Sequence, residues 1–418
     1  MSESIKSVLI IGKVWPESRS SAAGSRMMQL IGVFKDHGFE THFASAASSS
    51  NYSDDLTIQG VVCHKIKLND SSFDLFVKKL NPTVVMFDRF MTEEQYGWRV
   101  AEQCPDAIRI LDTEDLHSLR VTRQKCFKEG VPFHPKLMFQ EEITKREMAA
   151  IYRSDLSIVI SNYEMKLLLN TFEISALNLC YLPFLFDSIS DSDQNELPKF
   201  DERNGFMMIG NYLHDPNRNA VKWLKNEIWP LIRSQLPDVN LNIYGSYTSP
   251  RELQMQNRKE GFYVHGRVDD VKQVISQSKV MLAPLRYGAG LKGKLFDAIQ
   301  SGTPSVTTSI GCEGISDSDH WCGAVCDDPK SFADAAVNLY LNKSDWGKAQ
   351  TKGVSIVRDR FLVKDHLPDF IKILNGLIEN IKAHRQNQFI GSMLMHHTLA
   401  GNKYMSKWIE EKEKRGSL

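Results

Sequence analysis

Short runs of apolar, largely β-branched residues recur along this chain, with helical or loop segments between them. Such runs predict buried strands, because turn-forming residues bound each of them. The segment Ser25–His37 predicts a helix that ends at His37-Gly38. Repeated strand and helix units favour a parallel, Rossmann-like α/β sheet. In the first half the predicted strands are Val8–Gly12, Phe39–Ala44, Val61–Ile66, Val84–Phe87, Ile108–Asp112, Leu156–Ser161 and Leu179–Leu182.

A second series of the same kind begins at Gly205, after a polar run at Asp187–Asn204 that predicts a linker. Because 418 residues exceed what one hydrophobic core usually supports, we expect two domains, at 1–188 and 205–364, followed by C-terminal helices at 365–418. The predicted strands here are Phe206–Gly210, Leu241–Tyr244, Phe262–His265, Val280–Pro284 and Ser305–Thr308, with amphipathic helices at Ala220–Leu236 and Val268–Ser278. Two doubly wound domains of this kind bind ligands in the cleft between them.

Charge and composition exclude several classes of protein. Basic and acidic residues both number 51, so no global charge indicates a nucleic-acid partner. No apolar run is long enough for a signal peptide or a membrane span, which predicts a cytoplasmic protein with at most peripheral contact with the inner membrane face. The seven cysteines suit a reducing compartment. Cys312, His320, Cys322 and Cys326 match no common zinc module, so we expect no metal site.

The segment Ala283–Ile299 predicts an anion site. Gly288 and Gly290 allow a loop whose backbone N–H groups approach a ligand, and a helix that starts near Leu291 directs its positive end to the same place. Lys292 and Lys294 add two charges there. A diphosphate fits this arrangement, and Asp297 lies where it would bind sugar or ribose hydroxyls.

Glycines also follow other predicted strands, where bare backbone lets a ligand come close. Gly24 lies in the small-residue loop Ser20–Arg26 after the first strand. In the second half we expect the ligand to contact Gly210 and Asn211, Gly245, and Arg267 and Val268.

A cluster of charged residues follows the predicted strand Ile108–Asp112. Asp112, Glu114, Asp115, His117 and Arg120 occur within nine positions, a grouping that suits acid/base or hydroxyl-binding work at a strand end. The alternative is a salt-bridged helix start with acidic residues in its first turn.

The loop that contains Gly288 and Gly290 also satisfies a dinucleotide fingerprint by its letters. Gly288, Gly290 and Gly293 have the required spacing after a strand, and Glu313 lies downstream as a ribose ligand would. A dehydrogenase is therefore an alternative. Against it, two lysines occupy the loop, and Glu313 lies several residues beyond its strand.

Several of these segments together resemble the nucleotide-binding domain of glycosyltransferase family 4. They are Gly210–Ala220, with Arg218 inside it and Trp223 and Trp229 beyond, Val264–Asp270, the loop with Gly288, Gly290, Lys292 and Lys294, and Asp297–Pro304. The resemblance implies the GT-B fold, with two Rossmann-like domains facing a cleft. It implies a retaining glycosyltransferase that needs no metal or other cofactor and uses a nucleoside-diphosphate sugar as donor. The first domain would bind the acceptor, the second the donor, and a helix near Asp365–Lys382 would cross back.

The sequence departs from the family pattern at two places. The family commonly has two glutamates in this loop, where this chain has Ala289 and Asp297, and the loop instead matches a branch with Gly-Xaa-Gly-Xaa-Lys-Xaa-Lys. The usual catalytic histidine aligns with Glu114, while His117 lies one turn later. The catalytic residues expected are thus Glu114, His117 and Lys292, with the first two as alternatives. A nucleotide-sugar epimerase and a non-catalytic nucleotide-sugar-binding protein stay open, as do glycan, lipid-linked and small-molecule acceptors.

Overall fold

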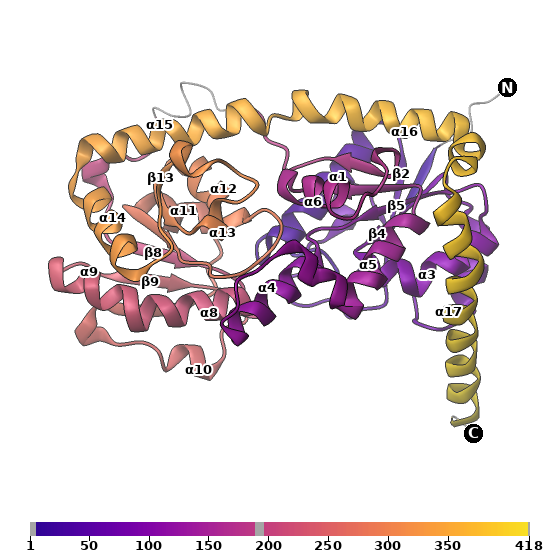
Figure 1. Cartoon of the computed structure of the whole chain (residues 1–418), viewed down its shortest axis with the longest axis horizontal. Coiled ribbons are helices and arrows are strands. Elements are labelled where there is room, and N and C mark those ends of the chain that lie inside the picture. The colour runs from indigo at the N-terminus through magenta and orange to yellow at the C-terminus, as the bar shows by residue number, and fades with distance from the viewer. Residues whose placement is uncertain (1–5, 189–195, 417–418) are drawn as a thin grey trace.

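The computed structural model describes residues 6–188 and 196–416, and it has two parallel sheets that each anchor one half of the chain (Figure 1). The first sheet has seven strands in the order β3-β2-β1-β4-β5-β6-β7, and the second has six in the order β10-β9-β8-β11-β12-β13. In both orders the chain reverses its direction of winding beside the first strand, which is the topological switch point where doubly wound sheets bind ligands.

The strands of the first sheet lie close to their predicted positions. Most of their side chains are buried, because helices cover both faces of a parallel sheet, and the exceptions lie mainly in the edge strand Val62–Lys65. The strands are β1 (Ser7–Ile11), β2 (Glu40–Ser45), β3 (Val62–Lys65), β4 (Val84–Asp88), β5 (Ile108–Asp112), β6 (Leu156–Val159) and β7 (Leu179–Tyr181). The helices are α1 (Ala22–Asp36), α2 (Ser72–Leu80), α3 (Phe90–Gln103), α4 (His117–Glu129), α5 (Glu142–Arg153) and α6 (Asn162–Asn170).

The second sheet confirms the five predicted strands and adds one that the sequence did not reveal. The extra strand is β13 (Gly323–Val325), a three-residue edge strand that is too short to produce a hydrophobic pattern. The others are β8 (Phe206–Ile209), β9 (Leu241–Tyr244), β10 (Phe262–Gly266), β11 (Val280–Ala283) and β12 (Ser305–Thr307). The surrounding helices are α8 (Asp215–Trp223), α9 (Trp229–Gln235), α10 (Pro250–Leu253), α11 (Val271–Gln277), α12 (Gly293–Gln300), α13 (Ser309–Cys312), α14 (Pro329–Leu341) and α15 (Lys343–Arg360).

The single helix predicted at Ala220–Leu236 is wrong in detail. A π-helical turn, η5 (Leu224–Ile228), separates α8 from α9. Pro230 explains the interruption, because proline has no N–H to donate to the carbonyl one turn earlier.

Two further helices end the chain. Helix α16 (Val363–Gln386) starts where the chain leaves the second half and adds Phe370, Leu374 and Leu377 to the core of the first sheet. It is the crossing helix expected near Asp365–Lys382. Helix α17 (Phe389–Gly416) then runs along α3 and α5, and its C-terminal end projects beyond the body (Figure 1).

The chain passes between the two halves at two places that lie side by side. Phe186 donates its backbone N–H to the Phe361 carbonyl at 3.0 Å, and Val363 donates to the Phe186 carbonyl at 2.9 Å. The linker predicted at Asp187–Asn204 begins there, and its residues 189–195 lie outside the described part of the chain.

Candidate active site

A cavity of about 1590 Å³ lies between the two halves, at the carboxyl ends of both sheets. Most of the residues that the sequence singled out line it. From the first half these are Gly24, Glu114 and His117, and from the second half Gly210, Asn211, Gly245, Val268, Gly288, Gly290, Leu291, Lys292, Lys294 and Asp297. The structure therefore brings both predicted clusters to one place.

Two predicted ligand-binding residues do not line this cavity. Arg218 lies on α8 with its side chain 38% exposed, and its Nε is 3.7 Å from a carboxylate oxygen of Glu252. Arg267 pairs with Asp269 and stacks over the ring of Tyr52 at 4.5 Å. Neither arginine lines the cavity, so their roles as direct ligands stay predictions.

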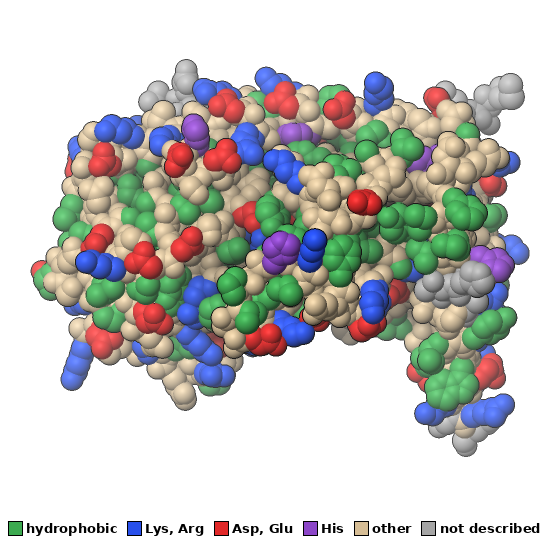
Figure 2. Space-filling model, in the orientation of Figure 1, with side chains coloured by type: hydrophobic (Ala, Val, Ile, Leu, Met, Phe, Trp, Pro, Cys, Tyr) green, Lys and Arg blue, Asp and Glu red, His purple; other side chains and the backbone are tan. Residues whose placement is uncertain are grey.

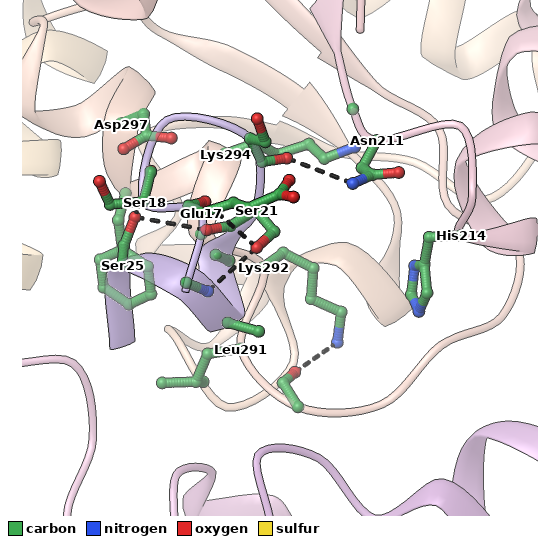
Figure 3. Close-up of a pocket in the computed structure, with 18 of the residues that line it drawn as sticks. Glu17, Ser18, Ser21, Ser25, Asn211, His214, Leu291, Lys292, Lys294 and Asp297 are labelled. Carbon is green, nitrogen blue, oxygen red and sulfur yellow. Dashed lines mark hydrogen bonds between the residues drawn. The ribbon is translucent and has the colours of Figure 1, made fainter. Parts of the chain in front are cut away.

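Of the two loop lysines, Lys292 is buried and Lys294 is half-buried, and neutral oxygen atoms hold both. Lys294 donates from Nζ to the side-chain oxygen of Asn217 at 2.6 Å, and Lys292 donates to the Gly290 carbonyl at 2.8 Å. Figure 3 shows Lys294 and Asp297 beside Glu17, Ser18 and Ser21 at the start of α1. Helix α12 begins at Gly293, two residues later than predicted, so both lysines flank its N-terminus.

Burial shifts the pKa values of the charged groups at this place. Desolvation lowers the pKa of Lys294 to about 7, although Asp297 opposes the shift. Desolvation also raises the pKa of Asp297 to about 6, against the effect of Lys272 and Lys294. The pKa of Lys292 is likewise lowered by burial. An anion that entered the cavity would favour the charged form of both lysines.

The glycine at 290 serves a different purpose from the one predicted. Its N–H donates to the Glu164 carboxylate at 2.7 Å, so in this structure that amide is not directed at a phosphate. Its φ is +64°, and a Cβ there would lie 2.8 Å from the Cβ of Asp115. Glycine is required because the loop packs tightly against the first half of the molecule. Gly288, by contrast, has no neighbour closer than 3.8 Å to such a Cβ.

The acidic cluster after β5 is buried against the cavity. Desolvation, with the nearby Asp112, raises the pKa of Glu114 well above its ordinary value. Desolvation raises the pKa of Asp112 itself to about 6. One carboxyl oxygen of Glu114 and both of Asp112 are buried without a hydrogen-bond partner. Glu114 has a φ of +59°, which is uncommon for a residue with a side chain and typical of functional sites.

His117 is the first residue of α4 and lies beside the same cluster. Burial lowers its pKa to about 4, although the nearby Asp115 acts in the opposite direction. Its Nε2 is 3.3 Å from a carboxyl oxygen of Asp115, which also accepts a hydrogen bond from Arg120 at 2.7 Å. The salt-bridged helix start is thus present for Asp115 and Arg120, while Glu114 and His117 face the cavity.

Other cavity residues were missed in the sequence. Asp88 ends β4 and Arg89 follows it, and both line the cavity, as do Lys13, Glu17 and His214. Asp88 was detectable, because it is a carboxylate that directly follows the buried run Val84–Phe87. Glu17 carried no signal, since it is placed by long-range contact: its carboxylate accepts a hydrogen bond from the Tyr247 hydroxyl at 2.7 Å.

The dinucleotide fingerprint does not hold in three dimensions. Glu313 forms a two-point ion pair with Arg123, with both N–O distances 2.7 Å. Both oxygens of its carboxylate therefore contact Arg123, and Glu313 is not placed as a ribose ligand. Residues 284–292 also separate β11 from α12, which makes a long loop where the fingerprint requires a tight turn.

The described residues form neither a metal-binding cluster nor a membrane-spanning helix. Among the residues that the structure describes, no group of three or more His, Cys, Asp or Glu side chains is arranged to hold a metal ion. Within residues 6–188 and 196–416, none of the helices combines the length and the apolar character needed to cross a membrane.

Comparison with known proteins gives one family match and one curated relative. Residues 203–342 match the family model described as "Glycosyl transferases group 1". An uncharacterized 44.6 kDa protein in the cps region of Klebsiella pneumoniae is 22% identical over 173 residues. The match covers 39% of this chain and 44% of that protein, which is less than half of its length.

Several solved structures are similar over most of the chain. Sucrose-phosphate synthase from Thermosynechococcus elongatus is 15% identical, with a TM-score of 0.65, over 90% of this chain and 100% of that one. A mutant S. aureus TarM in complex with fondaparinux, alpha-GlcNAc-glycerol and UDP is 10% identical, with a TM-score of 0.67, over 88% and 100%. Anabaena HepE in complex with UDP and glucose is 12% identical, with a TM-score of 0.62, over 88% and 99%.

These likenesses, with the two parallel sheets, confirm the predicted fold. The narrower assignment to family 4 stays a prediction. Residues 203–342 match the model of the glycosyl transferases group 1 family, and they lie in a chain that has the GT-B fold.

Proposed function

We propose that this protein transfers a sugar from a nucleoside-diphosphate sugar to an acceptor hydroxyl, with retention at the anomeric carbon and without a metal ion. Residues 205–364 would bind the donor and residues 1–188 the acceptor. The observation that carries the proposal is the position of Lys292, Lys294 and Asp297, which meet in the cavity between the two halves. Donor complexes of proteins with this fold support it, since HepE binds UDP and glucose.

The donor diphosphate would lie between the start of α12 and the start of α1. There Lys294 is half-buried, has a pKa of about 7 and donates a hydrogen bond to Asn217. A diphosphate would supply the negatively charged partner that Asn217 does not give this amine. Asp297 lies one turn further along α12, where its carboxyl group would accept hydrogen bonds from the ribose hydroxyls.

The reaction breaks the bond between the anomeric carbon and the phosphate oxygen. The electron pair of this bond leaves with the nucleoside diphosphate, and Lys292 and Lys294 stabilise the negative charge that develops. The acceptor oxygen forms the new bond to the anomeric carbon, and its proton passes to the phosphate oxygen of the departing nucleoside diphosphate. Because both lysines are in position before the reaction begins, they stabilise that charge without having to reorganise. This electrostatic stabilisation is the main catalytic effect available here.

Glu114 or His117 would orient the sugar or the acceptor hydroxyl. The raised pKa of Glu114 favours its protonated carboxyl, a form that can both donate and accept a hydrogen bond. His117 has a pKa of about 4 and is neutral at pH 7, so its imidazole can do the same.

Ligand-dependent thermal stabilisation tests the donor site. We would measure unfolding of the protein with UDP, GDP, ADP, TDP and NAD, beside the variant Lys292→Ala/Lys294→Ala. We expect one nucleoside diphosphate to stabilise the natural protein and not the variant, which should also lose sugar transfer while keeping its fold. Full transfer activity in the double variant would exclude the proposed role of the lysines, and stabilisation by NAD alone would exclude the donor assignment.

A further inference from the structure

Helix α17 exposes large apolar side chains along its length. Phe389 is 76% exposed, Tyr404 69%, Trp408 60% and Met405 59%. Ile390 and Met393 are each 47% exposed. Figure 2 shows hydrophobic side chains that continue down this helix to its projecting end. Single exposed apolar residues are ordinary, but an extended group on one helix marks an interaction surface.

The opposite face of α17 is anchored to the body mainly by polar and charged contacts. Arg99, whose side chain is 1% exposed, donates to the Ser406 hydroxyl at 3.2 Å and lies 3.7 Å from a carboxylate oxygen of Glu410. Glu410 also accepts the backbone N–H of Ser71 at 3.1 Å. Lys403 forms an ion pair with Glu102. The helix therefore turns several of its polar groups inward.

The exposed apolar residues share one side of the helix. At 100° per residue, Phe389, Met393, Ile390, Tyr404, Trp408 and Met405 fall on a single face, away from Ser406 and Glu410. An ordinary surface helix has the reverse arrangement, with its apolar stripe against the core. The reversal means that the outward face suits an environment other than bulk water.

Basic residues lie on the same outward face near the end of the helix. Lys412 and Arg415 are exposed and project on the side of Trp408, and Lys412 lies 5.3 Å from the centre of the Trp408 ring. Among the acidic residues, Glu410 points inward to Arg99, while Glu411 lies on the outward side and pairs with Lys414 at 3.1 Å. The face thus combines aromatic, methionine and cationic side chains.

We propose that this outward face of α17 docks on an anionic membrane surface, with the helix axis lying along the bilayer. Aromatic rings prefer the boundary between headgroups and acyl chains, and lysine and arginine bind anionic headgroups. Helices that lie in this boundary combine such an apolar face with basic residues. The projecting end of the helix reaches such a surface without hindrance from the body (Figure 1). This inference does not depend on the proposed donor chemistry.

Vesicle binding of the full-length protein tests the proposal. We would measure co-sedimentation with phosphatidylcholine vesicles that contain about one third phosphatidylglycerol and with pure phosphatidylcholine vesicles. We expect binding to the anionic vesicles that weakens as salt is added. The variant Tyr404→Ser/Met405→Ser/Trp408→Ser should lower the partition coefficient by about tenfold or more. Lys412→Glu/Arg415→Glu should remove the preference for anionic vesicles.

A matched control changes exposed apolar residues elsewhere. Ile58→Ser/Leu75→Ser/Leu341→Ser replaces side chains that are 83%, 74% and 63% exposed, and it should bind vesicles as the natural protein does. Nucleoside diphosphate binding in solution should be the same in all variants, because none of the described side chains of α17 lines the cavity. Absence of vesicle binding, or equal binding by the α17 variant, would overturn the proposal. Dimerisation seen by analytical ultracentrifugation and lost in that variant, without vesicle binding, would assign the face to a second copy instead.

Discussion

Lys294 is the residue whose environment says most about the ligand. The residue is half-buried, its hydrogen-bond acceptor among the described residues is the neutral side chain of Asn217, and its pKa falls to about 7. An amine in such a place is only partly charged at neutral pH. An anion that binds beside it raises the pKa again, so the site gains a proton as it gains the anion.

Proton uptake on binding is therefore the first prediction. At pH 8 the free protein carries Lys294 mainly as the neutral amine, because that pH lies above the pKa of about 7, and binding of a nucleoside diphosphate should take up a proton. Below pH 6 the amine is already charged and this uptake should vanish. Calorimetry in buffers of different ionisation enthalpy measures the number of protons.

Lys294→Met should lose this uptake and bind the nucleotide more weakly, by about ten- to a hundredfold, since a hydrogen bond to a charged group contributes about 1.5–3 kcal/mol. Lys222→Met, on α8 and outside the cavity, is the control and should change neither quantity. Equal heats in all buffers, with equal affinity in the Lys294 variant, would disprove this role of the lysine.

The two glycines of the donor loop give a second, matched prediction. Gly290→Ala should destabilise the protein by about 1–2 kcal/mol or more, because its φ is positive and the added methyl would lie 2.8 Å from the Cβ of Asp115. It should also lower transfer activity, since the loop could no longer pack against the first half. Gly288→Ala has open space and should leave stability nearly unchanged. Thermal unfolding and steady-state kinetics of the two variants decide the matter, and equal stability of the pair would contradict it.

At the scale of elements, α4 holds the donor loop through Arg123. The guanidinium pairs with Glu313 at two points and donates to the Gly288 carbonyl at 2.9 Å, so one side chain joins α4 to two loops of the second sheet. The Arg123 side chain is 5% exposed and that of Glu313 14%. Buried pairs of this kind are costly to break, because the remaining charge has no partner.

Glu313→Gln should accordingly lower the stability of the protein by about 2–5 kcal/mol, the usual cost of truncating a buried charge pair across an interface. Asp359→Asn, which removes an exposed partner of Arg358, is the control and should cost less than about 1 kcal/mol. Denaturant unfolding of both variants measures the difference. A loss no larger than that of the control would show that the pair does not hold the two halves together.

The elements also show what the sequence could predict. The strands were predictable because a buried strand in a parallel sheet is a continuous apolar run, as at Val84–Asp88 and Ile108–Asp112. The short edge strand Gly323–Val325 was not, because its three half-buried residues give no pattern. The glycine at 290 was recognised as special for the wrong reason: its partner Asp115 is distant in the sequence, and only the fold brings the two together.

For the molecule as a whole, the two crossings between the halves form one junction. Phe186 and Phe361 lie on the two crossings, and both rings pack on Phe296 of α12, with ring centres 5.2 and 4.8 Å apart. Helix α12 also carries Lys294 and Asp297. The junction that sets the relative position of the halves is therefore in direct contact with the helix of the proposed donor site.

This arrangement predicts that a change at the junction affects transfer more than donor binding. Phe186→Leu removes the ring that stacks on Phe296. The two halves should then lose their fixed alignment, while the donor contacts of the second half stay in place. A displacement of about 1 Å between reacting groups can lower a rate by up to about a hundredfold, so we expect kcat/KM for transfer to fall by at least about tenfold. Nucleoside diphosphate affinity, measured by calorimetry, should change by less than about twofold. Such a change is far below the binding free energy of about 1.4 kcal/mol that corresponds to a factor of ten.

Phe172→Leu, which alters a partly buried ring of the first half away from the junction, should leave both quantities unchanged. Parallel losses of affinity and transfer in the Phe186 variant would mean that the junction supports the donor site itself and not the alignment of the two halves.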